Sequence, residues 1–430
     1  MKKLNKKACL AIHGGSKSIR IRFAPYRSLG AEEVQAARKV VQSGQLSRYL
    51  GCWDPDFYGG PHVQSFERKW AKYFKVKHAI AVNSWTSGLV AALGAIGLEP
   101  GDEVIVSPWT MCASATAILH WNAIPVFADI DRETFCIDPK QVEKNITPYT
   151  KAILAVDIAG QSADMERLMP LAKKHKLKVI CDTAQAPAAK IRGKYAGTLA
   201  DIGGFSLNYH KHIHTGEGGV AVTNDDDLAE KMRLIRNHAE AVVKEKGTKS
   251  LVNMIGHNFR LGEIEAAIGI EQLKKLNKLV AGRQKIARQL DSGLGTLPGL
   301  QIPKIRDGCT HVYYVYGMQL DTFGLKVSRE KIHAALVAEG VPALACGYQN
   351  LHLLPLYQEK IAYGSKGFPW SSDICRREVS YAKGICPVAE DLHDRSFLGL
   401  GICSHSFLER QVAEIIKAFH KVWKNMDSLR

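Results

Sequence analysis

Lys211 lies in the segment FSLNYHKHIHTGEGG (205–219), directly before a glycine-rich turn. A lysine with an ordinary pKa near 10.4 must lose its proton before its amine can attack a carbonyl carbon. Burial and neighbouring cations lower that pKa. The segment therefore predicts a lysine that forms a Schiff base, although a lysine taken alone is more often a solvated surface residue.

Two further segments offer groups that suit the same chemistry. Asp182 ends the apolar run KVICDT (178–183), where its carboxylate either keeps a pyridine nitrogen protonated, as pyridoxal phosphate (PLP) requires, or caps a helix. The segment NSWTSGL (83–89) is a turn of small residues that opens a helix at about Thr86. Free N–H groups there bind a phosphate or belong to an ordinary capped helix.

These residues need a scaffold that brings them together, and the hydrophobic pattern supplies one. Between about 78 and 224, short apolar runs alternate with helical patterns, which predicts a mostly parallel sheet covered by helices. Ligands of such sheets collect at the carboxyl ends of the strands. Seven strands are predicted: AIAV near 80, VIVS at 104, IPVFADI at 124, AILAVDI at 152, KVICDT at 178, GGFSL at 203 and GVAVT at 219.

The rest of the chain predicts four parts in order. An N-terminal segment (1–30) precedes a large domain (31–260), and a helical pattern over 261–291 connects it to a smaller α+β domain (292–430). Within the smaller domain we expect a strand at HVYYVYGMQL (311–320) and helices at SREKIHAALVAEG and FLERQVAEIIKAFHKVW.

Composition excludes several classes of protein. The 430 residues are 46% hydrophobic and 23% charged, values that exclude a disordered, collagen-like or coiled-coil chain. The formal charge of +16 suggests an anionic partner, but Lys and Arg are spread along the chain and no nucleic-acid-binding motif accompanies them. We therefore expect no nucleic-acid partner.

Cysteine usage and the lack of long apolar runs point to the cytoplasm. Ten cysteines are scattered without a C-x-x-C pair, which indicates neither a disulfide framework nor a zinc module. The apolar run in MKKLNKKACLAI ends at His13 and is too short for a secretory signal. No run reaches the roughly 18 apolar residues of a membrane span.

Read in order, these segments resemble the DegT/StrS family of PLP-dependent sugar or cyclitol aminotransferases, enzymes of fold type I. The resemblance covers nearly the whole chain and implies an α/β fold. Further segments that carry it are LAIHGGSKSIR (10–20), PGDEVIVSPWT, IPVFADIDRETFCIDP, VDIAGQSADM, CDTAQAPAA, LIRNHAE and GHNFRLGEIEAAIG.

The resemblance assigns roles to residues of this sequence. The pattern S-x4-K-x4-G-E-G-G places the Schiff-base lysine at Lys211, with Asp182 on the pyridine nitrogen. Gln185 is expected near the phenolic oxygen of the cofactor. The expected phosphate-binding residues are Ser206 and the turn at Trp85 and Thr86.

Two positions deserve separate expectations. The segment GHNFR places Asn258 where the family reaches the phosphate of a neighbouring subunit, which implies a homodimer with shared active sites. Family members commonly have an aromatic residue that stacks on the cofactor ring, and the sequence places Cys112 there. Trp109 or Trp85 is then the alternative stacking partner.

The implied reaction moves an amino group from glutamate or glutamine to a keto-sugar, a sugar nucleotide or a cyclitol ketone. The terminal segments resemble the cyclitol enzymes, whereas the positive charge favours a nucleotide-linked or acidic sugar. The loops RYLGCWDPDFYGGPH (48–62) and ACGYQNLHLLPLY (345–357) carry side chains suited to hydroxyl-rich ligands.

Two alternatives remain at the level of sequence. Related dehydratases that use pyridoxamine phosphate carry histidine in place of the lysine, and a shift of one residue would put His210 or His212 in that position. A non-catalytic binding or regulatory protein is suggested only by the positive charge. The alternating histidines 210, 212 and 214 lack the Cys or carboxylate pattern of a ligand set, so we expect no metal.

Overall fold

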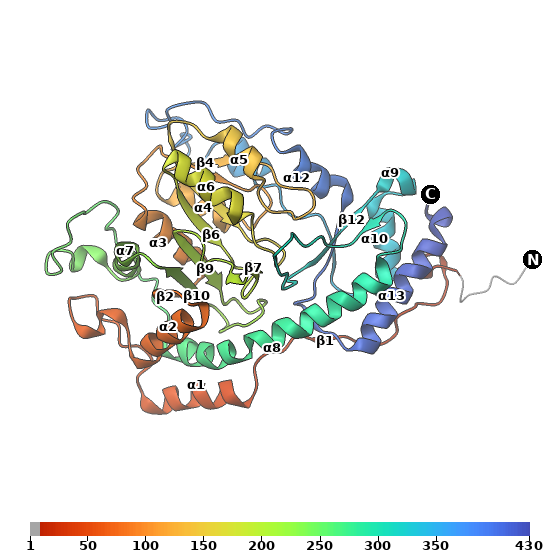
Figure 1. The fold of residues 1–430 in the computed structure, drawn as a ribbon, viewed down its shortest axis with the longest axis horizontal. Helices are drawn as coiled ribbons and strands as arrows, with labels where there is room; N and C mark the ends of the chain where they lie inside the picture. Colours follow the sequence, from red (N-terminus) through yellow and green to blue (C-terminus); the bar gives the residue numbers. More distant parts are fainter. Residues whose placement is uncertain (1–8) are drawn as a thin grey trace, which may run out of the picture.

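Residues 9–430 are described by a computed structural model (Figure 1). The predicted N-terminal segment begins with residues 1–8, which lie outside the described residues; of the apolar run considered as a secretory signal, only Ala8 falls within residues 1–8. Leu10 is buried, and short strand β1 (Ala24–Pro25) pairs with β15 (His405–Ser406) near the other end of the chain. The segment is thus attached to the C-terminal part of the molecule.

A seven-stranded sheet forms the centre of the larger part of the chain. Its strand order is β2-β10-β9-β6-β5-β3-β4, and β10 alone runs antiparallel to its two neighbours. The sequence prediction of a mostly parallel sheet built from seven runs is confirmed. The strands are β2 (His78–Val82), β3 (Glu103–Val106), β4 (Ile124–Phe127), β5 (Thr150–Val156), β6 (Lys178–Asp182), β9 (Ile202–Ser206) and β10 (Gly219–Thr223).

Helices cover both faces of this sheet. Alternate side chains of a strand point to opposite faces, so each strand packs against both layers of helices. Ile80 packs with the group formed by α3, α4 and α7, whereas its neighbours Ala79 and Ala81 pack with α2 and α8. The resulting three layers leave the strand ends as the place where loops meet (Figure 1). The helices are α1 (Ala31–Ser43), α2 (Pro61–Phe74), α3 (Trp85–Ala95), α4 (Ala113–His120), α5 (Pro139–Asn145), α6 (Met165–His175), α7 (Asp226–Arg236) and α8 (Glu263–Leu294).

The C-terminal part has its own sheet and its own buried core. Helix α8, where the sequence predicted a connecting helix over 261–291, runs from the large sheet to this second core, to which Leu290 and Leu294 belong. The strand order of the antiparallel sheet is β11-β12-β14-β13. The strands of this sheet are β11 (Leu300–Gln301), β12 (Tyr316–Leu320), β13 (Leu344–Cys346) and β14 (Phe397–Leu400). The helices of the C-terminal part of the chain are α9 (Thr322–Leu325), α10 (Arg329–Ala338), α11 (Pro355–Gln358), α12 (Pro387–Asp391) and α13 (Glu409–Lys424). A small hairpin of β7 (Lys190–Ile191) and β8 (Lys194–Tyr195) lies beside the large sheet.

Two sequence predictions need correction here. The strand expected over 311–320 begins only at Tyr316, because Val312 and Val315 donate their backbone N–H groups to the carbonyls of Gly160 and Ala159. Residues 351–392, assigned to the smaller domain, pack against the core of the large sheet. Tyr381 from this segment donates to the carbonyl of Pro125, on edge strand β4, so the segment covers that edge.

Candidate active site

The residues predicted to do chemistry meet at one edge of the large sheet. Asp182 is the last residue of β6 and Ser206 the last of β9, and these two strands are parallel neighbours. Strand β10 is antiparallel and starts at the same edge, where Gly219 pairs with Ser206 and Val82. The turn after Val82 therefore lies beside Ser206.

The N-terminus of α3 faces this edge with free backbone amides. Ser84 caps the helix by accepting the N–H of Ser87, at 3.1 Å. Within residues 9–430, the amides of Trp85 and Thr86 donate to no protein atom. A Cβ built on Gly219 would lie 2.5 Å from the Trp85 nitrogen, so glycine keeps the strand close to these amides. Free amides at a helix N-terminus suit a phosphate.

Lys211 is enclosed in the loop between β9 and β10. Backbone bonds from Leu207 to Gly218 and from Thr215 to Leu207 close the base of this loop. The Lys211 side chain is 8% exposed and its Nζ lies 4.6 Å from the centre of the Tyr314 ring. Burial lowers the pKa of the amine to about 8, against the opposing effect of the Asp182 charge. The amine is therefore neutral far more often than an exposed lysine.

Asp182 is held by three donors. Trp85 Nε1 donates to Oδ1 at 2.9 Å, the amide of Ala184 to the same oxygen at 3.1 Å, and Ser114 Oγ to Oδ2 at 2.9 Å. Burial raises the pKa of the carboxyl, while these bonds and the charge of Lys211 act in the opposite direction. Thr110 Oγ1 lies 3.1 Å from Ser114 Oγ and extends the network.

Gln185 is fixed on the same side of the sheet. Its Oε1 accepts the backbone N–H of Ala159 at 2.9 Å, and its Nε2 donates to the hydroxyl of Tyr348 at 3.4 Å. Tyr348 comes from the loop 345–357, which the sequence proposed as a substrate loop. The structure thus brings this loop to the predicted cofactor residues.

Cys112, Trp109 and Trp85, the residues considered for the position against the cofactor ring, differ in their burial and contacts. Cys112 is half-buried at the start of α4, directly after the exposed side chain of Met111. Trp109 is 2% exposed and packs against the rings of Tyr348 and Phe397. Trp85 is 4% exposed and lies within the core. The two indoles are therefore occupied by protein contacts, and the cofactor contact expected of Cys112 stays a prediction.

Asn258 lies beside the turn of its own chain that is predicted to bind the phosphate. The amide of Asn83 donates to the carbonyl of Phe259 at 2.9 Å, and its side chain donates to the carbonyl of Asn258 at 3.4 Å. The Asn258 side chain itself is exposed. Its predicted reach into a neighbouring subunit is a prediction that the single chain does not test.

The three histidines around Lys211 separate into different environments. His212 is buried and its Nε2 lies 2.9 Å from the carbonyl oxygen of Val312, while His210 is exposed. Burial keeps the pKa of His212 well below its ordinary value, so this ring is neutral. Across the described residues, no group of three His, Cys, Asp or Glu side chains is arranged to hold a metal ion.

Sequence reasoning missed Ser114, Tyr314 and Tyr348 as members of this site. Ser114 is the second residue of α4, and Thr110, whose hydroxyl lies 3.1 Å from that of Ser114, comes from the loop that precedes this helix. Tyr314 was included in a predicted strand, and its pairing with Lys211 depends on the loop that replaces that strand. No local pattern marks either tyrosine.

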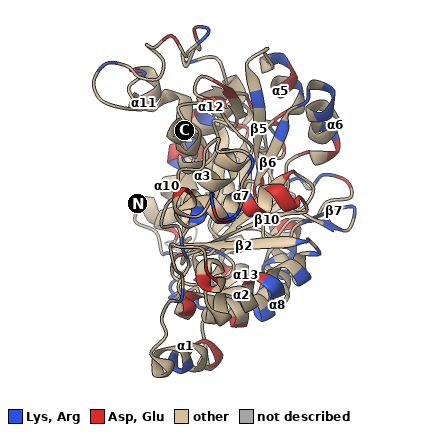
Figure 2. Cartoon of the chain, turned by 90° about the vertical axis from the view of Figure 1, so that its left-hand side faces the viewer, with Lys and Arg blue, Asp and Glu red and all other residues tan. Residues whose placement is uncertain are grey.

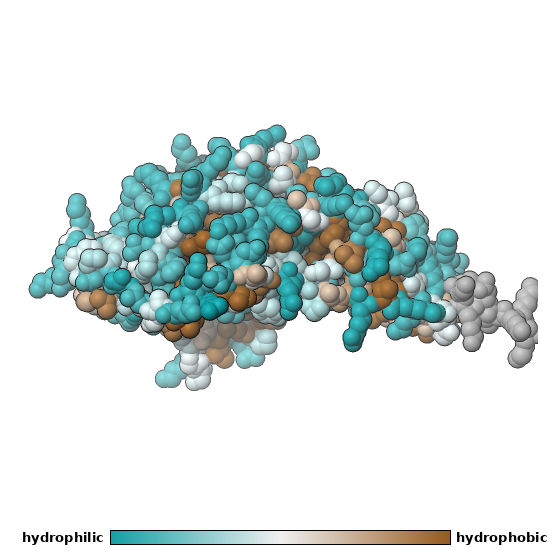
Figure 3. Space-filling view, turned by 90° about the horizontal axis from the view of Figure 1, so that it is seen from below, coloured by the Kyte–Doolittle hydropathy of each residue, from teal (hydrophilic) through white to brown (hydrophobic). Residues whose placement is uncertain are grey.

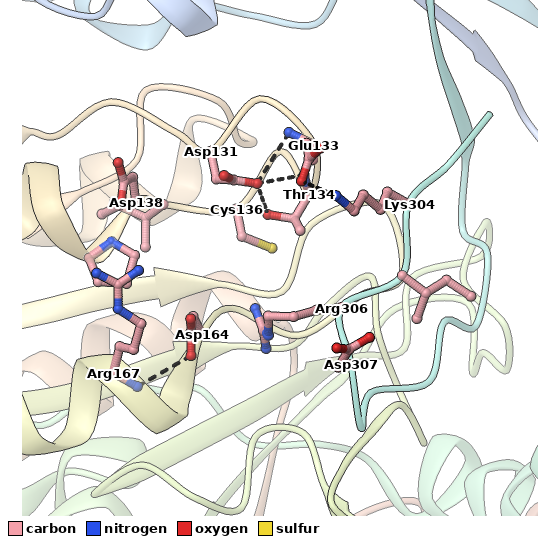
Figure 4. A pocket seen from close by; sticks show the side chains of 13 residues that line it. Asp131, Glu133, Thr134, Cys136, Asp138, Asp164, Arg167, Lys304, Arg306 and Asp307 are labelled. Atoms are coloured by element: carbon pink, nitrogen blue, oxygen red, sulfur yellow. Dashed lines mark hydrogen bonds and ion pairs between the residues drawn. The ribbon is translucent and has the colours of Figure 1, made fainter. Parts of the chain in front are cut away.

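A separate hollow of about 330 Å³ lies away from these residues (Figure 4). Its walls come from the loop after β4, the start of α6 and the segment 304–307, and none of the predicted cofactor residues lines it. Asp131 there accepts bonds from the backbone of Glu133 and Thr134, and Lys304 pairs with Glu133. Asp131, Glu133 and Lys304 thus all have partners among the walls of the hollow.

The surplus of positive charge is dispersed over the surface. Lys and Arg positions lie along the helices α5, α6 and α8, among others, instead of being confined to one segment (Figure 2). Many of them pair with carboxylates, as Lys174 does with Glu143. In the part of the chain that the structure describes, no helix is long and apolar enough to cross a membrane.

The fold and the placement of these residues define a fold type I enzyme of the aminotransferase class. The structure of the aminotransferase from Psychrobacter cryohalolentis matches with a TM-score of 0.80 and 29% sequence identity, covering 94% of this chain and 100% of that one.

Sequence comparison then gives the family. A family model described as the DegT/DnrJ/EryC1/StrS aminotransferase family matches residues 28–392, and this chain belongs to that family. It is 35% identical to the spore coat polysaccharide biosynthesis protein SpsC of Bacillus subtilis over 83% of this chain and 91% of that protein. It is 31% identical to the L-glutamine:2-deoxy-scyllo-inosose aminotransferase of Micromonospora echinospora over 98% of this chain and 99% of that protein.

Proposed function

We propose that this chain is a PLP-dependent aminotransferase that moves an amino group from glutamate or glutamine to the ketone of a sugar, a sugar nucleotide or a cyclitol. The observation that carries the proposal is the buried amine of Lys211, whose pKa burial lowers to about 8. The chain's membership of an aminotransferase family supports the reaction class.

The residues of the site fit pyridoxal phosphate. The free amides of Trp85 and Thr86 and the hydroxyl of Ser206 suit its phosphate, since they lie together at the helix N-terminus. Asp182 would bind the pyridine N–H and Lys211 would attach the aldehyde carbon. The Gln185 carboxamide, fixed by Ala159, would lie near the phenolic oxygen.

Each side chain then has a defined task in the reaction. The chemistry supplied by bound PLP is an electron sink for the charge that develops at the reacting carbon. Lys211 Nζ accepts the proton that leaves the α-carbon of the amino donor and, in the second half of the reaction, gives a proton to the former ketone carbon of the acceptor, which requires the neutral amine that burial favours. Asp182 holds a proton on the pyridine nitrogen by remaining charged. Tyr314 lies against Lys211 Nζ and limits the positions that the amine can adopt.

The acceptor class rests on two supports. The matched relatives include an enzyme named for a cyclitol ketone and others named for perosamine synthesis. The loop 345–357 brings Tyr348 to the site, where a phenol can donate to or accept from a hydroxyl group of a sugar or cyclitol. We place the sugar or cyclitol ring against this loop.

The function is tested by loading the purified protein with PLP and measuring the visible absorbance of the bound cofactor. We expect a bound-cofactor band in the wild type and in Lys140→Ala, which changes an exposed lysine on α5, and no such band in Lys211→Ala. Keto-sugars, sugar nucleotides and inososes are then assayed with glutamate or glutamine. Formation of 2-oxoglutarate or 2-oxoglutaramate is expected. Loss of water from a sugar without consumption of donor would instead support the dehydratase alternative.

We further propose a homodimer with shared active sites. Hydrophobic side chains on and after α1 are exposed in the single chain, as expected of a surface that another subunit covers (Figure 3). They are Val34, Val41, Leu46, Leu50 and Trp53.

Mixed dimers test this arrangement. If the partner's Asn258 completes each site, a dimer of one Lys211→Ala chain and one Asn258→Ala chain contains one intact site. Refolding the two inactive variants together should therefore restore activity, while each variant alone stays impaired. A lack of restoration, with a dimer seen by sedimentation, contradicts the shared site.

A cytoplasmic location also stays a proposal, supported by ten free cysteines.

A further inference from the structure

The side chain of Trp85 links the two ends of the candidate site. Its backbone amide belongs to the free N-terminal turn of α3, while its indole Nε1 donates to Asp182 Oδ1 at 2.9 Å. Both residues are buried, with exposures of 4% and 5%. One residue therefore contacts the carboxylate through its side chain and lines the phosphate turn through its backbone.

The sheet and the helix make room for this indole with two glycines. A Cβ built on Gly204, in β9, would lie 1.8 Å from the indole ring, and one built on Gly88, in α3, would lie 2.4 Å from it. Any larger residue at either position would displace the ring. The indole is thus held between strand and helix, and its N–H points at Asp182 without freedom to turn away.

The Asp182 carboxylate needs this support because its other two donors do not fix its orientation by themselves. Ser114 holds only Oδ2, and the amide of Ala184 reaches Oδ1 from the chain next to Asp182 itself. The indole N–H approaches Oδ1 from a separate element, α3. Donors from two helices and the local backbone together fix the carboxylate plane.

We infer that Trp85 is a positioning residue for Asp182, which aligns the carboxylate with the pyridine end of the site and ties that alignment to the phosphate turn. This inference rests on the proposed function. It gives Trp85 a role different from stacking on the cofactor ring, for which its buried indole is not available. The side chain of Trp85 acts on the reaction only through Asp182.

The test compares Trp85→Phe with Trp121→Phe. Trp121 is another buried tryptophan of the same core, and its Nε1 donates to the carbonyl of Val90 at 2.8 Å. Both substitutions remove a buried N–H bond, but only the first one touches Asp182. The measured quantities are the dissociation constant of PLP, from equilibrium dialysis of the apoprotein, the melting temperature of the apoprotein, and kcat separately from KM.

Loss of a hydrogen bond to a charged group is worth about a tenfold change or more. We expect Trp85→Phe to weaken PLP binding and to lower kcat by about tenfold each, with KM for the acceptor changed less than about twofold. Trp121→Phe should leave the three constants within about twofold of the wild type. In an Asp182→Asn background, Trp85→Phe should add less than about twofold, because the two residues act as one unit.

Equal effects of the two tryptophan variants, or full additivity of Trp85→Phe with Asp182→Asn, would overturn the inference. A wild type that binds no PLP would instead refute the proposed function. If Trp85→Phe lowers the melting temperature of the apoprotein strongly, benzothienylalanine at position 85 replaces it. That side chain keeps the bicyclic shape and lacks the N–H, so wild-type PLP affinity with it also contradicts the role.

Discussion

Two buried aspartates lie side by side at the carboxyl edge of the large sheet, and they differ in what surrounds them. Asp157 follows the last residue of β5, and its amide donates to the carbonyl of Asp182 on neighbouring β6, at 2.9 Å. Burial raises the pKa of both carboxyls, to about 6 for Asp157. Burial and a raised pKa therefore do not separate the candidate catalytic carboxylate from its neighbour.

The partners of each carboxylate do separate them. Asp157 accepts bonds from the amide of Ala163, in the turn that follows its own strand, and from the side chains of Cys181 and Thr183, at the end of the neighbouring strand β6. The side-chain donors to Asp182 come from two helices, and its charge acts on the buried amine of Lys211. The donors to Asp157 lie in its own turn and on the adjacent strand, whereas Asp182 joins two helices to the sheet and its charge acts on a second reactive group, Lys211.

Asp182→Asn should give the largest difference between the two positions. The amide cannot hold a charge opposite a pyridine N–H, and loss of one preorganised electrostatic partner lowers kcat by about 10² to 10³-fold. Asp157→Asn, which leaves every proposed cofactor contact in place, should change kcat by less than about tenfold. Steady-state rates with saturating donor and PLP measure both. Equal losses at the two positions would show that Asp182 has no special role.

The sequence predicted the scaffold of this edge better than its contacts. The seven apolar runs marked the strands, and Lys211, Asp182 and Ser206 follow them at positions where parallel topology forces side chains together. The indole of Trp85 was not predictable in its role, because its direction depends on the space above Gly88 and Gly204.

Long-range placement explains the other omissions. Tyr314 and Tyr348 reach the site only because residues 311–315 leave the expected strand and because the loop 345–357 folds back over the sheet edge. Such contacts join residues more than 100 positions apart, and no periodic pattern records them. Residues 351–392 are a further case. The sequence assigned them to the smaller domain, whereas in the structure they pack on the large sheet.

The stability of the protein should respond to pH through Asp157. Its folded pKa of about 6 lies above its ordinary value of 3.8, so the folded state binds more protons between these values. The contribution of this carboxyl to stability therefore falls as pH rises from about 3.8 to about 6 and remains low above that range. Asp157→Asn lacks this contribution. Its free energy of unfolding should gain up to about 3 kcal/mol on the wild type between pH 4 and pH 7.

Urea unfolding of the apoprotein at a series of pH values measures this change, and the pH-independent cost of the altered hydrogen bonds cancels in it. Parallel curves for wild type and Asp157→Asn would show that the carboxyl does not titrate as its burial implies.

The smallest expected effect concerns Lys211, and it compares the reach of the two charges. The amine should titrate near pH 8, because burial lowers its pKa while the Asp182 carboxylate raises it in part. Asp182→Asn removes that opposing effect and should move the midpoint below 8 by less than about one unit, whereas Asp157→Asn should leave it in place. Acylation of apoprotein Lys211 across a pH series, followed by peptide mass spectrometry, gives the midpoints. A midpoint near the ordinary 10.5 would contradict the burial of the amine, and equal shifts in both variants would mean that the Asp157 carboxylate also acts on Lys211.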